Sequence, residues 1–141
     1  MIKNVIADKG AIVALIDDSD NFHDWAIEQV RNLLPPFSTC EGVIAEASHL
    51  LKAIENGQQT LLAFIEQGFL RIDFSLAAEI AEVEALMQKY RDVPMDLADA
   101  CLVRMSELIE GSTVFTLDSD FWVYRKSGKK QIPLIIPDKT A

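Results

Sequence analysis

Cysteine and histidine, the residues that most often build zinc and catalytic sites, are scarce in this chain. It has two of each among 141 residues. Cys40 and Cys101 lie far apart, which is neither a metal-ligand spacing nor a disulfide framework, so we expect two buried free thiols. His23 and His49 belong to different segments, and neither adjoins a Ser or Cys that looks like a nucleophile, so the sequence does not indicate a catalytic triad.

Positive charge is also in short supply. The chain has 13 Lys and Arg against 22 Asp and Glu, which gives a net charge of −9. This charge opposes nonspecific binding to a polyanion. A nucleic-acid substrate would need a local basic strip or metal ions to approach, whereas a basic protein partner would suit the acidic surface directly.

Long apolar runs, internal repeats and low-complexity segments are missing as well. No stretch approaches the length needed to cross a bilayer, and the N-terminus lacks the basic-then-apolar pattern of a secretory signal. We therefore expect a cytoplasmic protein without membrane association. Half of the residues are hydrophobic and a quarter are charged, which is typical of a globular chain. The length fits one domain with a single core, residues 1–141.

The first apolar segment ends abruptly at an acid. Residues 5–7 (Val-Ile-Ala) have the pattern of a short buried strand, Asp8 follows at once, and a helix-compatible run resumes after Gly10. An acid at the end of such a strand lies at the edge of an open α/β sheet where ligands bind. It is also a good helix N-cap, so Asp8 by itself leaves function and capping open.

Helical and strand patterns alternate along the rest of the chain. The spacing of apolar residues predicts helices over 22–34, 43–54, 58–67, 76–90 and 96–109, a single helical turn at 121–125, and strands over 37–40, 69–74, 113–117 and 132–136. Strands that alternate with helices imply βαβ units with right-handed crossovers. The predicted fold is therefore α/β, a three-layer α/β/α sandwich with a central, mainly parallel sheet of about five strands.

Four acids from separate segments are expected at one edge of this sheet. Asp8 and Asp118 directly follow strands, and the carboxyl ends of parallel strands share an edge. Glu46 lies within about a turn of that edge, on a helix that starts there. Asp99 opens a helix of about 20 Å that must finish at the opposite edge, where the next strand begins. Taken singly, each acid could be a cap or a solvated helical residue, and Asp96 with Asp99 has the spacing of a cap.

The negative charges of clustered carboxylates repel one another and must be neutralised. Two unit charges about 4 Å apart near a protein surface repel by about 4 kcal/mol, so several together imply bound cations or raised pKa values. Oxygen ligands without Cys or His favour Mg²⁺ or Mn²⁺ over zinc. Such ions lower the pKa of bound water and stabilise an oxyanion, which is the chemistry of phosphodiester hydrolysis.

Four short motifs carry these acids in order along nearly the whole chain. Asp8 follows the first strand, Glu46 lies in Val-Ile-Ala-Glu-Ala-Ser-His-Leu-Leu, Asp99 in Leu-Ala-Asp-Ala-Cys-Leu-Val, and Asp118 in Thr-Leu-Asp-Ser-Asp-Phe. Together they resemble the PIN domain, and more narrowly the small single-domain proteins that include VapC-type toxins. The resemblance implies a metal-dependent endoribonuclease whose four acids bind Mg²⁺ or Mn²⁺ and activate water.

The resemblance also implies supporting residues and partners. Asp120 would be an accessory metal ligand, Thr116 would support the site by hydrogen bonding, and Asp96 would cap its helix. Family members are commonly homodimers, and the toxins pair with an antitoxin that blocks the acidic site. The expected partners are therefore an RNA substrate, a second copy of the chain and a basic antitoxin.

Basic residues follow Asp118 closely and could guide the RNA backbone. They are Arg125, Lys126, Lys129 and Lys130, with Trp122 or Tyr124 available for stacking on bases. A solvated basic surface turn is the alternative interpretation of the same residues.

Positions 9 and 10 depart from the family pattern. The family usually has a small hydroxyl residue soon after the first Asp, often Asp-Thr-Ser, whereas this chain has Asp8-Lys9-Gly10. The change removes hydroxyl support for the first acid. Lys9 would point either into the acids, where it would partly replace a cation, or to solvent.

Two other classes of function stay open. A PIN-like protein-binding module without useful turnover would explain Lys9-Gly10, but the four acids oppose it. A phosphatase with Asp8 as its nucleophile would want a second Asp at position 10, where this chain has Gly.

Overall fold

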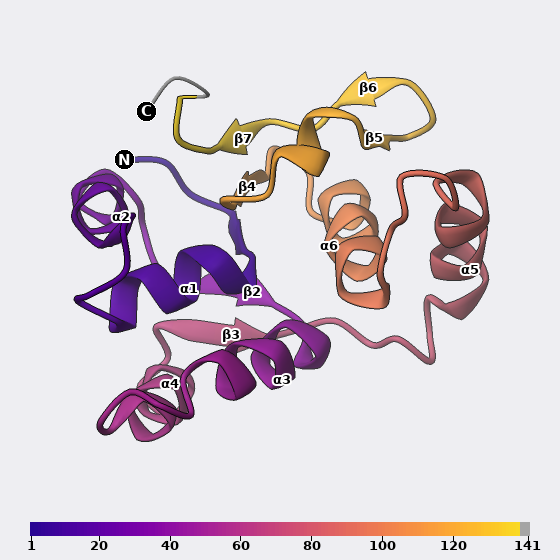
Figure 1. Cartoon of the computed structure of the whole chain (residues 1–141). Coiled ribbons are helices and arrows are strands. Elements are labelled where there is room, and N and C mark those ends of the chain that lie inside the picture. The colour runs from indigo at the N-terminus through magenta and orange to yellow at the C-terminus, as the bar shows by residue number, and fades with distance from the viewer. Residues whose placement is uncertain (139–141) are drawn as a thin grey trace.

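A parallel five-stranded sheet forms the centre of the structure, a computed structural model that describes residues 1–138 (Figure 1). Its strands are β1 (Val5–Ala7), β2 (Phe37–Thr39), β3 (Leu70–Ile72), β4 (Thr113–Phe115) and β7 (Leu134–Ile135). They are ordered β3-β2-β1-β4-β7, and every neighbouring pair is parallel. The predicted parallel sheet of about five strands is confirmed.

Helices cover both faces of this sheet. They are α1 (Lys9–Ile16), α2 (His23–Val30), α3 (Glu41–Leu50), α4 (Gly57–Glu66), α5 (Ile80–Lys89) and α6 (Leu97–Leu108). From β1 the chain adds β2 and then β3 on one side of β1, and it then crosses back to add β4 on the other side of β1. Right-handed crossovers therefore place α1 to α4 on one face and α5 and α6 on the other. Figure 1 shows α5 and α6 together on one side of the strands and α1 and α2 on the other, which is the predicted three-layer sandwich.

Element ends differ from the sequence predictions by up to four residues, and one local prediction was wrong. The helical turn expected at 121–125 lies earlier, as the 3₁₀ turn η1 (Ser119–Trp122). Residues 125 and 126 are instead β5 (Arg125–Lys126), the first strand of an antiparallel hairpin with β6 (Lys130–Gln131). Gly128 has a φ of +85° in the loop, a conformation that few other residues adopt easily.

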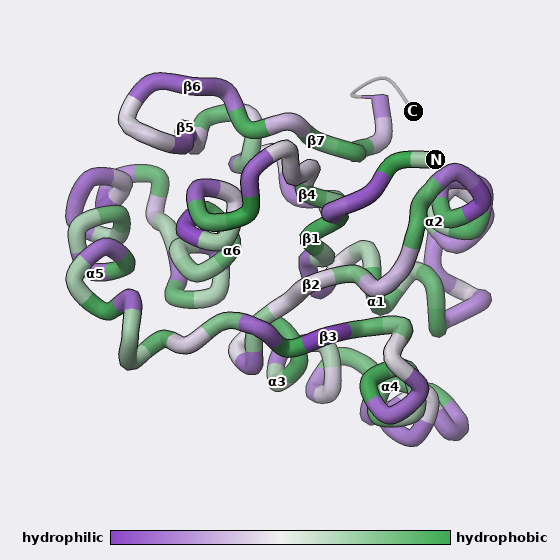
Figure 2. The backbone as a smooth tube through the Cα atoms, turned by 180° about the vertical axis from the view of Figure 1, so that it is seen from behind, coloured by the Kyte–Doolittle hydropathy of each residue, from purple (hydrophilic) through white to green (hydrophobic). Residues whose placement is uncertain are grey.

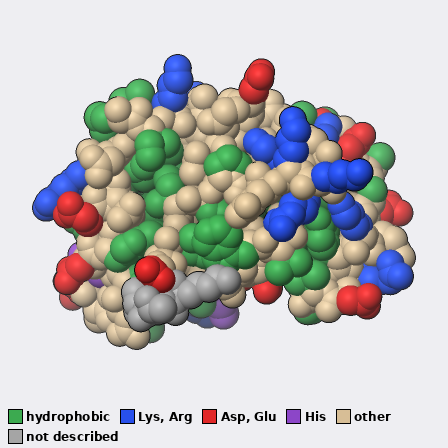
Figure 3. Space-filling view, turned by 90° about the horizontal axis from the view of Figure 1, so that it is seen from above, with side chains coloured by type: hydrophobic (Ala, Val, Ile, Leu, Met, Phe, Trp, Pro, Cys, Tyr) green, Lys and Arg blue, Asp and Glu red, His purple; other side chains and the backbone are tan. Residues whose placement is uncertain are grey.

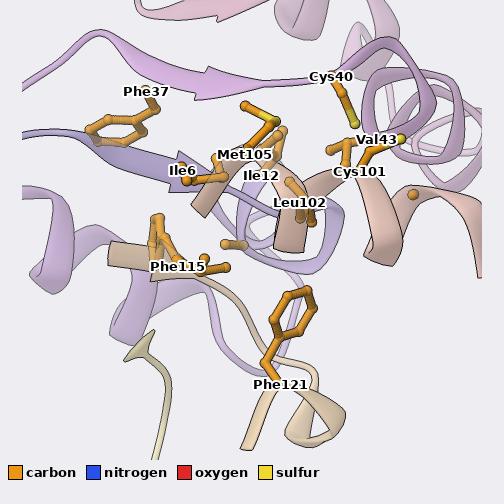
Figure 4. Packing of buried hydrophobic residues seen from close by; sticks show 14 of the residues in the cluster. Ile6, Ile12, Phe37, Cys40, Val43, Cys101, Leu102, Met105, Phe115 and Phe121 are labelled. Carbon is orange, nitrogen blue, oxygen red and sulfur yellow. The ribbon is translucent and has the colours of Figure 1, made fainter. Parts of the chain in front are cut away.

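The core is made by continuous apolar strands and by the inner faces of the helices. The three residues of β1 are fully buried, as expected for a strand covered on both faces. Figure 4 shows Phe37 and Phe115 beside β1, with Leu102 and Met105 of α6 pointing toward the same strand. Cys40 and Cys101 are buried free thiols, as predicted. This packing holds the carboxyl ends of the strands in fixed positions.

Hydropathy differs between the centre of the fold and its periphery. Figure 2 shows the hydrophobic residues of β1 inside the molecule and the strongly hydrophilic β6 at its border. Among residues 1–138, none of the helices has both the length and the apolar character that spanning a bilayer requires.

Candidate metal centre

Three carboxylates meet at the carboxyl edge of the sheet. Asp8 directly follows β1, Asp118 lies just beyond β4, and Asp99 lies in the first turn of α6. One oxygen atom from each of these side chains can be chosen so that all three lie within 4.8 Å of one another. They become neighbours because β1 and β4 are adjacent parallel strands and α6 starts at the edge where both strands end.

Thr116 links two of the three acids. Its hydroxyl group donates a hydrogen bond to Oδ2 of Asp8 at 2.7 Å and accepts one from the backbone N–H of Asp118 at 2.9 Å. The other oxygen of Asp8 accepts a hydrogen bond from the backbone N–H of Lys9 at 2.7 Å, so Asp8 also caps α1. Function and capping, which the sequence presented as alternatives, are therefore compatible at Asp8.

The first turn of α1 lies close to the chain that leads to Asp118. A Cβ atom at Gly10 would come within 3.3 Å of Leu117, which is tighter than ordinary van der Waals contact. The missing side chain at this position lets α1 approach the segment after β4, and so helps to bring the two acids together.

Asp99 is oriented by two residues of different kinds. Its backbone N–H donates to the side chain of Asp96 at 2.8 Å, so Asp96 is the N-cap of α6, as predicted. The hydroxyl group of Tyr124 donates to Oδ2 of Asp99 at 3.1 Å. Tyr124 is fully buried, so the expectation that it could stack on an RNA base was wrong. The sequence offered no signal for this contact, because an aromatic residue after η1 suits a stacking role equally well.

Burial and mutual repulsion raise the pKa values of the clustered acids. The pKa of Asp99 is raised to about 7, first by burial and then by the negative charges of its neighbours, Asp96 foremost, while the hydrogen bond from Tyr124 acts in the opposite direction. Burial also raises the pKa of Asp8, against the hydrogen bonds from Thr116 and Lys9. Carboxylates held together at this cost are typical of a cation site.

Glu46, expected to be the fourth acid of the site, is not in the group of three clustered carboxylates among the described residues and is paired with a lysine. The ammonium group of Lys9 forms an ion pair with Oε2 of Glu46 and lies 4.0 Å from an oxygen of Asp96. Of the two orientations that the sequence left open for Lys9, the structure has the one toward the acids. The pair is half-exposed, with 34% of the Lys9 side chain and 35% of the Glu46 side chain accessible.

Asp120 belongs to the turn that follows Asp118. Its backbone N–H donates to Oδ1 of Asp118 at 2.9 Å, which caps η1. The group of three clustered carboxylates among the described residues does not include the side chain of Asp120. What Asp120 contributes in this structure is the orientation of Asp118.

Most of the basic residues beyond Asp118 lie away from the acids. Lys126 and Lys130 line a hollow of about 280 Å³ together with Glu107, at the C-terminal end of α6, and Lys129 is exposed in the same hairpin. Asp99 is in the first turn of that helix, so the two places are about 12 Å apart along its axis. Figure 3 shows Lys and Arg side chains gathered on this part of the surface.

Arg125 is partly engaged in local structure. Its guanidinium group donates to the backbone carbonyl oxygens of Trp122 at 2.7 Å and Tyr124 at 3.2 Å. These bonds hold the start of the hairpin against η1. An RNA contact through Arg125 would have to use the donors that remain.

An open, mainly apolar groove lies beside the acids, and sequence reasoning missed it. It has a volume of about 350 Å³ and is lined by Lys9, Ala45, Glu46, His49 and Leu50. About half of the Leu50 side chain is exposed there. The helical spacing of the α3 residues indicated only a core-facing stripe, so the spacing could not reveal that the other face borders the site.

The fold and the site define an α/β domain with three clustered carboxylates that could hold a metal ion. The donor set fits Mg²⁺ or Mn²⁺, because the three clustered ligands are carboxylates. The PIN domain family profile matches residues 5–126, so this chain belongs to the PIN domain family.

One solved structure extends the comparison. The chain resembles the crystal structure of VapC20 from Mycobacterium tuberculosis, described as a toxin that cleaves the sarcin-ricin loop. The TM-score is 0.74 at 16% sequence identity, with 91% of this chain and 98% of that chain covered, so the likeness shows a shared fold. No curated protein matches this chain.

The Tyr124 hydroxyl group gives a first prediction. Tyr124→Phe removes the donor to Asp99 and with it the orientation of that carboxylate, so we expect Mn²⁺ to bind about 10- to 100-fold more weakly. Isothermal titration with Mn²⁺ measures this.

Tyr90→Phe is the matched control for this prediction. The Tyr90 hydroxyl group accepts a hydrogen bond from the backbone N–H of Arg125 at 2.8 Å and makes no hydrogen bond to an acid among the described residues. Both variants should lose about 1 kcal/mol of stability. Equal Mn²⁺ affinity in the two variants would show that the Tyr124 hydrogen bond is only structural.

Proposed function

We propose that this protein is a metal-dependent endoribonuclease that hydrolyses RNA phosphodiester bonds and is the toxin of a toxin–antitoxin pair. The observation that carries the proposal is the approach of Asp8, Asp99 and Asp118 to within 4.8 Å at the carboxyl edge of a PIN domain sheet. VapC20, which has the same fold, is described as a toxin that cleaves the sarcin-ricin loop, and this supports both parts of the proposal.

Asp8, Asp99 and Asp118 would hold Mg²⁺ or Mn²⁺ in this proposal. The ion would lower the pKa of bound water and neutralise charge on the scissile phosphate. The protein's own contribution is to fix the carboxylates in advance. Thr116 holds Asp8 and the backbone of Asp118 in one geometry, and Tyr124 holds Asp99, so little reorganisation is needed when the substrate arrives.

The remaining site residues take smaller parts. We propose that the backbone N–H of Asp120 positions the Asp118 carboxylate, and that Glu46 holds the ammonium group of Lys9 in place. Lys126, Lys129 and Lys130, with the free donors of Arg125, would bind RNA phosphates about 12 Å from the cleavage site along α6. Only an RNA that follows this helix could reach both places.

We also propose a homodimer and an antitoxin partner, both in the cytoplasm. The net charge of −9 favours an antitoxin with a basic segment. The groove beside Lys9 and Leu50 offers apolar surface next to the acids, where a bound partner would block access to them. Membership of the PIN domain family supports these assignments.

Cleavage of a pool of structured RNAs tests the proposed activity. We expect the wild-type protein to cleave RNA with Mg²⁺ or Mn²⁺, to stop with EDTA, and to resume when the metal is restored in excess. Asp118→Asn should be inactive, whereas Asp18→Asn, an exposed acid beyond the far end of α1, should be fully active. Cleavage that persists in EDTA or in Asp118→Asn would contradict the proposed mechanism. Metal binding without cleavage of any RNA would favour the protein-binding module instead.

A further inference from the structure

Lys9 connects three segments at the edge that carries the acids. It is the first residue of α1 and directly follows Asp8. Its ammonium group is paired with Glu46 of α3 and lies 4.0 Å from a carboxylate oxygen of Asp96, the N-cap of α6. A positive charge fixed to the chain therefore lies among acids that come from separate parts of the sequence.

The acids at this edge fall into two groups. Asp8, Asp99 and Asp118 have side-chain oxygens within 4.8 Å of one another. Glu46 and Asp96 face Lys9 instead, and are more exposed. The starts of α3 and α6 lie close to each other, since a Cβ atom at Gly42 would be 3.7 Å from Ala98. Glu46 and Asp96 therefore lie close together at this edge, and the ammonium group of Lys9 already provides a positive charge between them.

We infer that Lys9 is a built-in cation that keeps Glu46 out of metal coordination, so that the site holds one divalent ion and not two. The inference rests on the proposed function for its metal site. A second ion at Glu46 would have to displace the ammonium group and then lie beside it, and the two positive charges would repel each other. Because Lys9 adjoins Asp8 in the chain, its charge stays at the site whatever the metal concentration.

This role makes Lys9 a positioning residue. Its ammonium group has three donors, of which Glu46 takes one, and the side chain keeps its charge next to the groove it shares with His49 and Leu50. The neutralisation that a second ion would bring is thus supplied in part by the protein. Lys9 thus limits the site to one metal ion while the three-carboxylate group stays intact.

Titration with Mn²⁺ alone tests the inference, with stoichiometry from calorimetry and from the electron paramagnetic resonance signal of free Mn²⁺. We expect one ion per wild-type chain. Lys9→Met should bind two, the second more weakly, and the Lys9→Met, Glu46→Gln double variant should return to one. Lys9→Arg keeps the charge and should remain at one, and Glu46→Gln alone should bind one ion with an affinity within about threefold of wild type.

The possible stoichiometries separate this inference from the proposed function. Two ions on the wild-type chain, or a Lys9→Met variant that stays at one, would overturn the inference and leave the nuclease proposal standing. A wild-type chain that binds no Mn²⁺ would overturn both. A second ion in Lys9→Met that survives in the double variant would also overturn the inference, because that ion would not depend on Glu46.

Discussion

Asp99→Asn is expected to abolish RNA cleavage and to raise the stability of the protein in the absence of metal. The substitution removes one of three clustered carboxylates, so transition-state stabilisation by the ion should fall by several kcal/mol, on the order of 10³-fold in rate. The same change removes a buried negative charge that repels its neighbours. The asparagine can still accept the hydrogen bond from Tyr124.

The gain in stability should depend on pH in a definite direction. The pKa of Asp99 is raised from 3.8 to about 7 in the folded protein. Between these values the folded state holds a proton that the unfolded state has lost, so the free energy of unfolding of the wild type falls as pH rises through this window. Asp99→Asn removes the titrating carboxyl group and with it this pH dependence of the free energy of unfolding. Its advantage should be largest above pH 7 and should fade toward pH 4.

Thermal unfolding in EDTA, from pH 4 to pH 8, measures this effect. We expect the variant to exceed the wild type by on the order of 3–4 kcal/mol at pH 8, which is roughly 10–15 °C in Tm. Added Mn²⁺ should stabilise the wild type and leave Asp99→Asn almost unchanged. If the two proteins have equal Tm at pH 8 in EDTA, burial and repulsion by the neighbouring acids do not destabilise the charged form of Asp99 as the structure indicates.

Phe115→Ala is expected to cause the largest loss of stability. Phe115 is fully buried in β4, with its ring centroid 5.6 Å from that of Trp25 and 6.2 Å from that of Phe37. Its carbonyl oxygen accepts a hydrogen bond from the backbone N–H of Asp8 at 2.9 Å. Truncation leaves a cavity beneath the site and should lower the free energy of unfolding by about 3–5 kcal/mol.

Urea unfolding followed by circular dichroism gives this free energy directly. Leu62→Ala is the control, because Leu62 on α4 is 61% exposed, and its effect should stay within about 0.5 kcal/mol. A loss below about 1 kcal/mol for Phe115→Ala would mean that its surroundings close the cavity, contrary to the close packing of this core.

These two predictions concern opposite features of one site. Phe115 belongs to the packed sheet that fixes where the acids are, and Asp99 belongs to the charges that the sheet brings together. Removing the first should weaken the fold, whereas removing the second should strengthen the metal-free fold and weaken the activity. Such opposition is common where function requires groups that repel one another.

The sequence by itself determined the architecture and the edge at which the acids lie. Apolar runs and helical spacing alternate clearly enough to define βαβ units, and a parallel sheet then leaves little choice of topology. Asp8 directly follows β1 and Asp118 lies just beyond β4, so their position depends only on local patterns and strand direction. Asp99 could be placed because α6 leads straight into β4. Its role as a metal ligand stays a prediction.

Only the tertiary structure decided which side chains meet across that edge. The ion pair between Lys9 and Glu46, the hydrogen bond from Tyr124 to Asp99, and the distance of the basic hairpin from the acids have no counterpart in periodicity or spacing. Each depends on the reach of a long side chain, or on the docking of a short segment, between elements distant in the chain. Periodicity indicates which face of a helix or strand is buried. The partner of a polar side chain depends instead on how segments that are distant in the sequence pack against each other.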